Sequence, residues 1–376
     1  MAPLRSTLGR SFGNLLRVGR NRDLAGTETG GAAKHTQLNS RYYGARPKSV
    51  ENAVPIDATG GNVEFPLGDQ TYHLFRAPGT FTVNDGPPTA NAEIIVFGGG
   101  GSGGFFYGDG GGAGGGLVAT SYPLVPGPYT VVVGEGAAGP PDGSSANGAA
   151  GTASEFYPTP VGPGEGASNM YARGGGGGGY KQAEPHPAPP GGFPWNPVSG
   201  TGGGGGQHNG SNPEVTPNFP TSTQHPAVTS KLSAKGGDQP YYNSDSSGGG
   251  GMIGGGELYP ASCSACGGGG YESQWPGPGM YDAMPAPEQT AWGGTTWRDT
   301  LSPNGSIGGG GAGWRPTASS ESPRSPGGGG TGGSTVPNVD AVNYTGSGGG
   351  VYGPTGPGDG ADGGVWIRYS TKATDG

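Results

Sequence analysis

Blocks of consecutive glycines recur through most of this chain and constrain its fold more than any other feature. Runs of four or more occupy residues 98–101, 174–179, 202–206, 248–251, 267–270, 308–311 and 327–330. Collagen needs glycine at every third position because only glycine fits its axis, so glycine in blocks excludes a collagen triple helix. Linkers and disordered segments contain few aromatic residues, whereas this chain has 17 Tyr, 10 Phe and 6 Trp. A folded structure built largely from glycine is therefore expected.

Glycine runs of this length are suited to threefold extended helices of the polyglycine II type. Four to six residues span roughly 12–19 Å in such a helix. Helices without side chains can approach closely enough to hydrogen-bond to one another. Ordering glycine costs more entropy than ordering any other residue, so the helices are stable only if they satisfy one another as a bundle. We expect a packed polyglycine-II-rich domain with long Pro- and aromatic-containing loops over 140–363. Mobile glycine loops are the alternative.

Short segments predict β-strands on either side of this domain, some by alternating apolar and polar residues and others by runs of apolar and β-branched residues. The expected strands are 62–65, 71–75, 80–83, 93–97, 117–120, 129–133 and 364–369. The last of these resembles the early ones, which indicates that the end of the chain returns to close their sheet. We therefore expect a mainly β and irregular fold, with a small antiparallel β-sandwich as a support module over 59–139 and a closing strand and tail over 364–376.

The first 58 residues read as an extended arm of opposite charge to the rest. Residues 1–50 contain nine Lys or Arg against Asp23 and Glu28, a net charge of +7, so the total of −8 leaves −15 for the other 326 residues. One short helix is expected over 6–18. Its apolar face and adjoining arginines are the candidate docking residues: Leu8, Arg10, Phe12, Leu15, Leu16 and Arg17. The arm is predicted to attach the protein to a partner, with a solvated tail as the alternative.

No residue pattern predicts catalysis, a cofactor or a metal site. Cys263 and Cys266 form one CxxC motif without a second pair, whereas a structural zinc site needs four ligands. Residues 98–104 match G-x-G-x-x-G, but any polyglycine does, and no crossover helix is expected after them. We therefore expect a protein that is not an enzyme.

Aromatic residues in the connections between glycine runs are candidates for recognition. Aromatic rings on loops above a rigid scaffold offer large contact areas at low entropic cost, as in an antibody paratope. The candidate receptor-binding residues are Trp195, Tyr241, Tyr242, Trp275, Trp292, Trp297 and Trp314. The alternative is that these rings cover the glycine bundle in place of a conventional core.

An ordered series of motifs resembles the glycine-rich domain of bacteriophage virion and tail-fibre proteins. The motifs occupy residues 72–81, 94–98, 114–119, 126–134, 152–156 and 364–369, and the resemblance covers about 60–376. Residues 7–16 are similar to the starts of some marine cyanophage structural proteins. The resemblance implies a virion component that often recognises the host. Similarity to the adhesins that cap the long tail fibres of T-even-like phages implies the polyglycine architecture.

The expected function is that of a tail-fibre or adhesin protein, present in multiple copies per virion. Its partners would be other virion proteins, through residues 1–58, and a host-surface glycan or outer-membrane protein. No nucleic-acid binding, membrane insertion or signal peptide is expected, so the protein would be made in the host cytoplasm and released with the particle. The alternatives are a capsid decoration or tail appendage with a purely structural role, an extracellular matrix protein, and a depolymerase, which the lack of recognisable paired carboxylates disfavours.

Overall fold

The computed structural model describes residues 55–371 except 88–89, 106–107, 142–145, 165–167, 180–223, 233–247, 254–266, 302–303, 315–326, 333–339 and 353–355. All described residues belong to one compact unit, 54–373.

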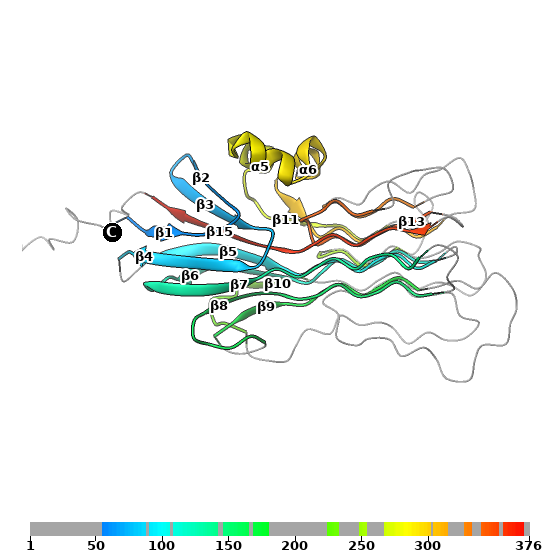
Figure 1. The fold of residues 1–376 in the computed structure, drawn as a ribbon, viewed down its shortest axis with the longest axis horizontal. Helices are drawn as coiled ribbons and strands as arrows, with labels where there is room; N and C mark the ends of the chain where they lie inside the picture. The colour runs from blue at the N-terminus through cyan, green and yellow to red at the C-terminus, as the bar shows by residue number, and fades with distance from the viewer. Residues whose placement is uncertain are drawn as a thin grey trace, which may run out of the picture. The chain divides into compact units, whose positions relative to one another are not determined.

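Two antiparallel sheets form the β part of this unit (Figure 1). Sheet 1 contains, in spatial order, β1 (Asp57–Thr59), β4 (Gly79–Asp85), β7 (Gly127–Val132), β8 (Ser154–Pro158) and β9 (Met170–Ala172). Sheet 2 contains β10 (Ser230–Leu232), β6 (Gly116–Pro123), β5 (Asn91–Phe97), β15 (Gly364–Ser370), β3 (Gln70–Phe75) and β2 (Val63–Leu67). The expected mainly β class is confirmed.

Successive side chains along the strands of sheet 2 point to opposite faces and pack in two separate apolar clusters. In β5, Ile94 and Val96 join the core between the sheets, whereas Ile95 and Phe97 join a cluster on the outer face of sheet 2. The inter-sheet core also contains Tyr129 and Phe156, whose rings stack with centroids 5.1 Å apart. Sheet 2 is therefore buried on both faces over part of its length.

The end of the chain does return to the sheet. Strand β15 lies between β5 and β3, and its Val365 pairs with Val96 on one side and with Phe75 on the other. The expectation of a closing strand is therefore confirmed.

Three short helices cover the outer face of sheet 2, and we call them the cap. They are α4 (Pro278–Ala283), α5 (Ala286–Ala291) and α6 (Gly294–Thr300), and Figure 1 shows α5 and α6 beside β2 and β3. They are not among the elements expected from the sequence. Each has only six or seven residues and lacks a side-chain N-cap, so its local signal is weak. None of the described helices is long and apolar enough to span a membrane.

Two small two-stranded antiparallel sheets lie within the glycine-rich region. Strand β11 (Tyr271–Glu272) pairs with β12 (Ser306–Ile307), and β13 (Val351–Tyr352) pairs with β14 (Gly356–Pro357).

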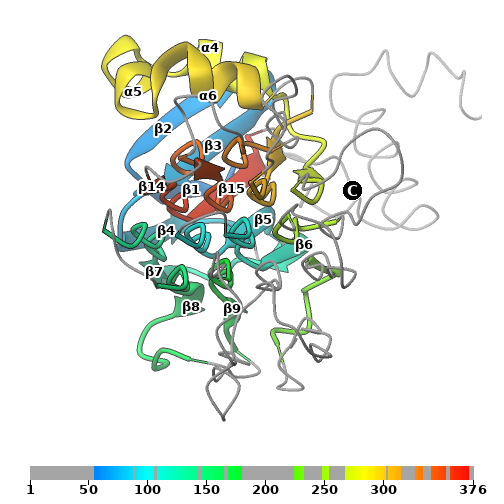
Figure 2. The same cartoon turned by 90° about the vertical axis from the view of Figure 1, so that its right-hand side faces the viewer.

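Glycine segments continue from the strands as a hydrogen-bonded bundle. Viewed end on, several of them appear as triangular coils, as expected for three residues per turn (Figure 2). We call these segments together the glycine bundle: 98–105, 108–115, 133–139, 146–152, 173–179, 248–252, 267–270, 308–314, 327–332, 346–350 and 358–363.

The hydrogen bonds of segment 98–105 repeat every three residues. The N–H groups of Gly98, Gly101 and Gly104 all donate to segment 108–115. Residues 99, 102 and 105 donate to segment 146–152, and residues 100 and 103 donate to segment 358–363. Carbonyls of the same segment accept N–H groups from three further segments, 133–139, 173–179 and 346–350. Six neighbours around one threefold helix define polyglycine II packing.

Close backbone approach explains why these positions are glycine. A Cβ atom placed on Gly100 would overlap the carbonyl oxygen of Ser347, and one on Gly101 would overlap that of Gly176. Glycine loses about 0.5–1 kcal/mol more than alanine on ordering, and a backbone hydrogen bond contributes about 0.5–1.5 kcal/mol net. The two terms are comparable, so the bundle is stable only where nearly every N–H finds its carbonyl.

Both ends of the described chain lie at the side of the sandwich away from the bundle. Strand β1 begins at Asp57, which pairs with Asp85 at the end of β4. Strand β15 leaves the bundle at Gly364 and finishes at Ser370, opposite Gln70. We call this side the terminal end of the molecule.

The glycine segments begin or finish at the opposite side, which we call the loop end. Three bonds place neighbouring segments together there: Gly104 N–H to Asp109 O, Asp109 N–H to Gly179 O, and Trp314 N–H to Gly108 O. The connections 106–107, 180–223 and 315–326 start directly after residues 105, 179 and 314. The bundle therefore brings the starting points of two long connections, 180–223 and 315–326, to one end of the molecule.

Candidate functional site

Many of the residues predicted to bind partners lie outside the described part of the chain. These are the docking candidates Leu8, Arg10, Phe12, Leu15, Leu16 and Arg17, with the expected helix that carries them, and the receptor candidates Trp195, Tyr241 and Tyr242.

The expectation that Trp275, Trp292 and Trp297 project from loop tips is wrong. Each is at most 1% exposed, and all three pack in the cluster between the cap and sheet 2. The Trp297 ring lies 4.9 Å from that of Trp292 and 6.2 Å from that of Trp366 on β15, measured between centroids. These rings form a core against sheet 2, whereas the alternative interpretation expected them to cover the glycine bundle, and they are not available to a receptor while the cap is folded.

Trp314 is the receptor candidate that the described residues place at the loop end. It is half-buried, and its backbone N–H donates to the carbonyl of Gly108 at 3.3 Å. Connection 315–326 begins at the next residue. Trp314 thus combines an aromatic ring with the position expected of a recognition residue.

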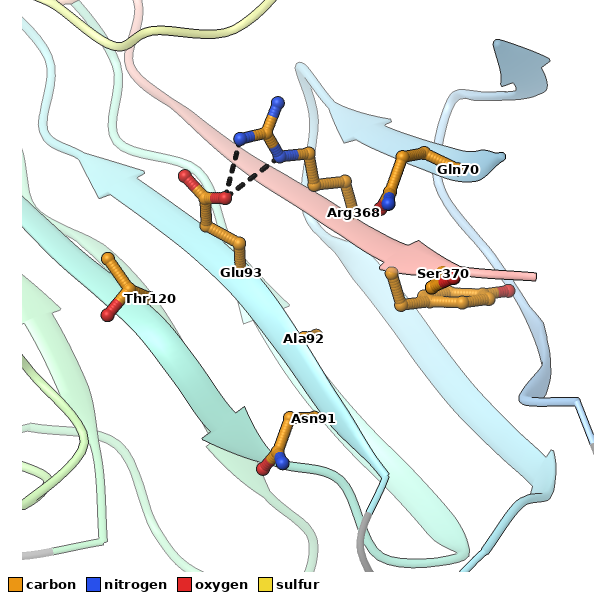
Figure 3. Close-up of a pocket in the computed structure, with 8 residues that line it drawn as sticks. Gln70, Asn91, Ala92, Glu93, Thr120, Arg368 and Ser370 are labelled. Atoms are coloured by element: carbon orange, nitrogen blue, oxygen red, sulfur yellow. Dashed lines mark hydrogen bonds and ion pairs between the residues drawn. The ribbon is translucent and has the colours of Figure 1, made fainter. Parts of the chain in front are cut away.

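A polar hollow of about 370 Å³ lies on the outer face of sheet 2, beyond the part that the cap covers (Figure 3). The side chains that share this face come from β3, β5, β6 and β15: Gln70, Asn91, Glu93, Thr120, Arg368 and Ser370. Strand register sets them in rows, because Ser370 pairs with Gln70, and Arg368 pairs with Glu93.

One ion pair forms the boundary between the hollow and the apolar cluster. The Arg368 guanidinium donates two hydrogen bonds to Glu93 Oε2, at 2.9 and 2.6 Å (Figure 3). The other carboxylate oxygen, Oε1, accepts a bond of 2.9 Å from Trp275 Nε1. The guanidinium carbon also lies 4.7 Å from the centroid of the Trp275 ring. Trp275 therefore holds both members of the pair.

The same two charged groups shift the pKa of the neighbouring Tyr271 phenol. Burial raises the pKa of its phenol, the Glu93 carboxylate raises it further, and the Arg368 guanidinium opposes both effects. The Tyr271 phenol therefore stays neutral at neutral pH.

The chemistry of the hollow suits hydrogen bonding rather than proton transfer. Its amides and hydroxyls are neutral donors and acceptors, and its one carboxylate is already bonded to a guanidinium and an indole. Acid–base catalysis needs a group that is free to exchange a proton with the substrate. Within the described ranges, no group of three or more His, Cys, Asp or Glu residues is placed to hold a metal ion.

Sequence reasoning did not identify this hollow. Its residues come from strands separated by up to 300 positions, from Gln70 to Ser370. The available signal was Glu93 and Arg368, single charged residues within otherwise apolar strands. A charge in a strand that is buried on both faces needs a partner, and register then pairs the two.

The fold and its surface define a class of protein: an antiparallel β-sandwich that is extended by a polyglycine II bundle. The family described as Glycine-rich domain matches residues 76–370. The chain belongs to this family, which confirms the glycine-rich part of the resemblance. No curated protein matches the chain.

Proposed function

We propose that this protein is a bacteriophage virion component of the tail-fibre or adhesin type. Residues 1–58 attach it to other virion proteins, and the connections at the loop end bind a host-surface glycan or outer-membrane protein. The observation that carries the proposal is the polarity of the molecule. Pro55 and Thr371, where the described chain begins and ends, lie at the terminal end, while connections such as 180–223 start from the loop end.

The charge of the arm and the rigidity of the glycine bundle also support attachment at one end and recognition at the other. The arm is basic and the rest of the chain is acidic, which suits two different partners. The bundle holds its segments by hydrogen bonds to several neighbours, so it can fix the points at which the flanking connections begin. Binding residues are typically carried on loops that a rigid scaffold positions.

Adsorption inhibition tests the proposal. Purified full-length protein is added to host cells before the phage that encodes it. Saturating protein should block adsorption, and the variant Trp314→Ala combined with Trp195→Ala should block it less well. The matched control is Val125→Ala, which removes an exposed side chain at the terminal end. Failure of the wild-type protein to bind cells or to reduce adsorption refutes receptor binding.

Antibody labelling of virions separates the two structural assignments. Labels on the tail fibres support the proposal. Labels distributed over the capsid support instead the alternative of a decoration protein.

A further inference from the structure

We propose that the hollow on the outer face of sheet 2 is a binding site for a neutral saccharide. It is lined by Gln70, Asn91, Glu93, Thr120, Arg368 and Ser370. The site lies near the terminal end, because Ser370 and Gln70 pair at the last position of β15. It is therefore separate from the receptor contacts proposed at the loop end, and the two proposals can fail independently.

The lining offers hydrogen bonds in both directions with no net charge. Asn91 and Gln70 have amides that donate and accept, and Thr120 and Ser370 have hydroxyls that do both. The two charged groups, Glu93 and Arg368, neutralise each other. A polyhydroxylated neutral ligand matches such a surface, because each of its hydroxyls also donates and accepts.

Charge disfavours an acidic ligand at this place. The one cation in the hollow, Arg368, is engaged by the Glu93 carboxylate at 2.6 Å and by the Trp275 ring. An acidic group entering the hollow would meet Glu93 without a free countercharge from Arg368. Residues 51–376 also carry a net charge of −15, that is, −8 minus the +7 of residues 1–50.

The polar lining also disfavours a peptide. Peptides and proteins typically anchor through aromatic or aliphatic side chains that fill apolar pockets. In this sheet face the apolar row, which includes Trp366, Ile95 and Leu74, is already covered by the cap. The part that remains open offers amides, hydroxyls and an ion pair.

Trp275, which precedes cap helix α4, makes the site rigid before any ligand arrives. Trp275 Nε1 bonds Glu93, and the Trp275 ring supports the Arg368 guanidinium. Trp275 is itself fixed by contacts with Tyr72 and Trp366, at centroid distances of 5.5 and 5.8 Å. Preorganised polar groups lose less entropy on binding, so the pair can orient a sugar ring without rearranging.

Calorimetry and tryptophan fluorescence on the full-length protein test the inference. The probes are tetrasaccharides of glucose, galactose, mannose and N-acetylglucosamine, with a tetragalacturonate as the acidic probe and a tetra-alanine peptide. At least one neutral tetrasaccharide should bind with a Kd in the millimolar range or below and change the tryptophan emission of the protein, because Trp275 contacts the ion pair of the site. The acidic and peptide probes should bind at least tenfold more weakly.

Three variants and one control locate the binding. Asn91→Ala and Gln70→Ala should each weaken it about two- to tenfold, the effect of one lost hydrogen bond. Thr80→Ala, on the exposed face of sheet 1, is the matched control and should bind as the wild type does. Trp275→Phe keeps a ring but removes the bond to Glu93, so it should weaken binding in protein that still unfolds cooperatively.

Three results would overturn the inference: no neutral probe binds, the acidic or peptide probe binds best, or Asn91→Ala and Gln70→Ala bind as tightly as Thr80→Ala does. Cell adsorption should be unchanged in Asn91→Ala if the receptor contacts lie at the loop end.

Discussion

At Gly100 the missing side chain is a packing requirement, since a Cβ would overlap the carbonyl oxygen of Ser347 in a neighbouring segment. Gly100→Ala should therefore lower the free energy of unfolding by at least about 2 kcal/mol, the usual cost of overpacking an interior. Urea denaturation followed by circular dichroism measures the change. Gly100→Val should lower the free energy of unfolding further.

Gly269→Ala is the matched control for this prediction. Gly269 also belongs to a glycine run, but a Cβ there would meet no atom within 4 Å. Its substitution should change stability by less than about 1 kcal/mol, and alanine's lower unfolded-state entropy favours a small gain. Equal losses in the two variants would contradict the packing argument.

The buried His73 should make the stability of the protein sensitive to acid. Its Nδ1 lies 2.7 Å from Gly60 O and its Nε2 lies 3.0 Å from the Tyr369 hydroxyl, so a neutral ring satisfies both partners by donating from Nδ1 and accepting at Nε2. Burial lowers the pKa of this imidazole, and the bond to Gly60 and the Glu64 carboxylate, 3.7 Å away, oppose the shift.

The native protein protonates His73 less readily than the unfolded chain does. The stability that neutral His73 contributes is therefore fully present above about pH 6.5, the pKa in the unfolded chain, and is lost as pH falls toward the lower native pKa. The free energy of unfolding should fall by up to about 1.4 kcal/mol per pH unit in that window. Urea titrations between pH 7.5 and 5 measure it. His73→Gln, which keeps a donor for Gly60, should flatten the slope, and an unchanged slope would rule out His73 as its source.

The cap depends on its tryptophans for stability. Trp297 is fully buried against Trp292 and Trp366. Trp297→Ala should cost about 3–5 kcal/mol, as for other large aromatic residues removed from a core. Trp297→Phe should cost clearly less. Denaturant unfolding followed by tryptophan fluorescence gives both values, and a loss below about 1 kcal/mol for the alanine variant would show that the ring is not part of a core.

The cap also shows where sequence reasoning stops. Strands such as β2 and β4 were predictable because alternating residues mark a half-buried strand locally. The role of Trp297 was not, since its neighbours in sequence are Gly, Thr and Arg, and its apolar partner Trp366 lies 69 positions away. The same holds for the hollow, whose rows exist only once β15 has paired with β3 and β5.

The glycine bundle was predictable as an element but not in its connectivity. Runs of glycine with aromatic residues between them exclude the alternatives of collagen and disorder. Which segment contacts which depends on many chain reversals that leave no trace in a run of identical residues. Segment 98–105, for example, has neighbours from residues 108 to 363.

For the whole molecule, the proposed polarity predicts which attachment points preserve host binding. Coupling a polyethylene glycol chain at Ala149→Cys, exposed on a segment that leads from the loop end, should block binding to cells. The same chain at Val125→Cys, at the terminal end, should leave binding intact. Both variants need Cys263 and Cys266 replaced by Ser. Equal inhibition at the two positions would contradict recognition through the loop end. Flow cytometry with labelled protein makes the measurement.

The three-residue repeat of the bundle also bears on how such a protein can diversify. A one-residue insertion within segment 98–105 would rotate every following N–H toward a different neighbour, and even a three-residue insertion would outgrow the six segments that surround it. Length changes inside the bundle would therefore have to occur in many places at once. Connections that begin beyond residues such as 179 and 314 escape this restriction. Natural variation among relatives should accordingly concentrate in the connections, while the glycine segments keep their lengths.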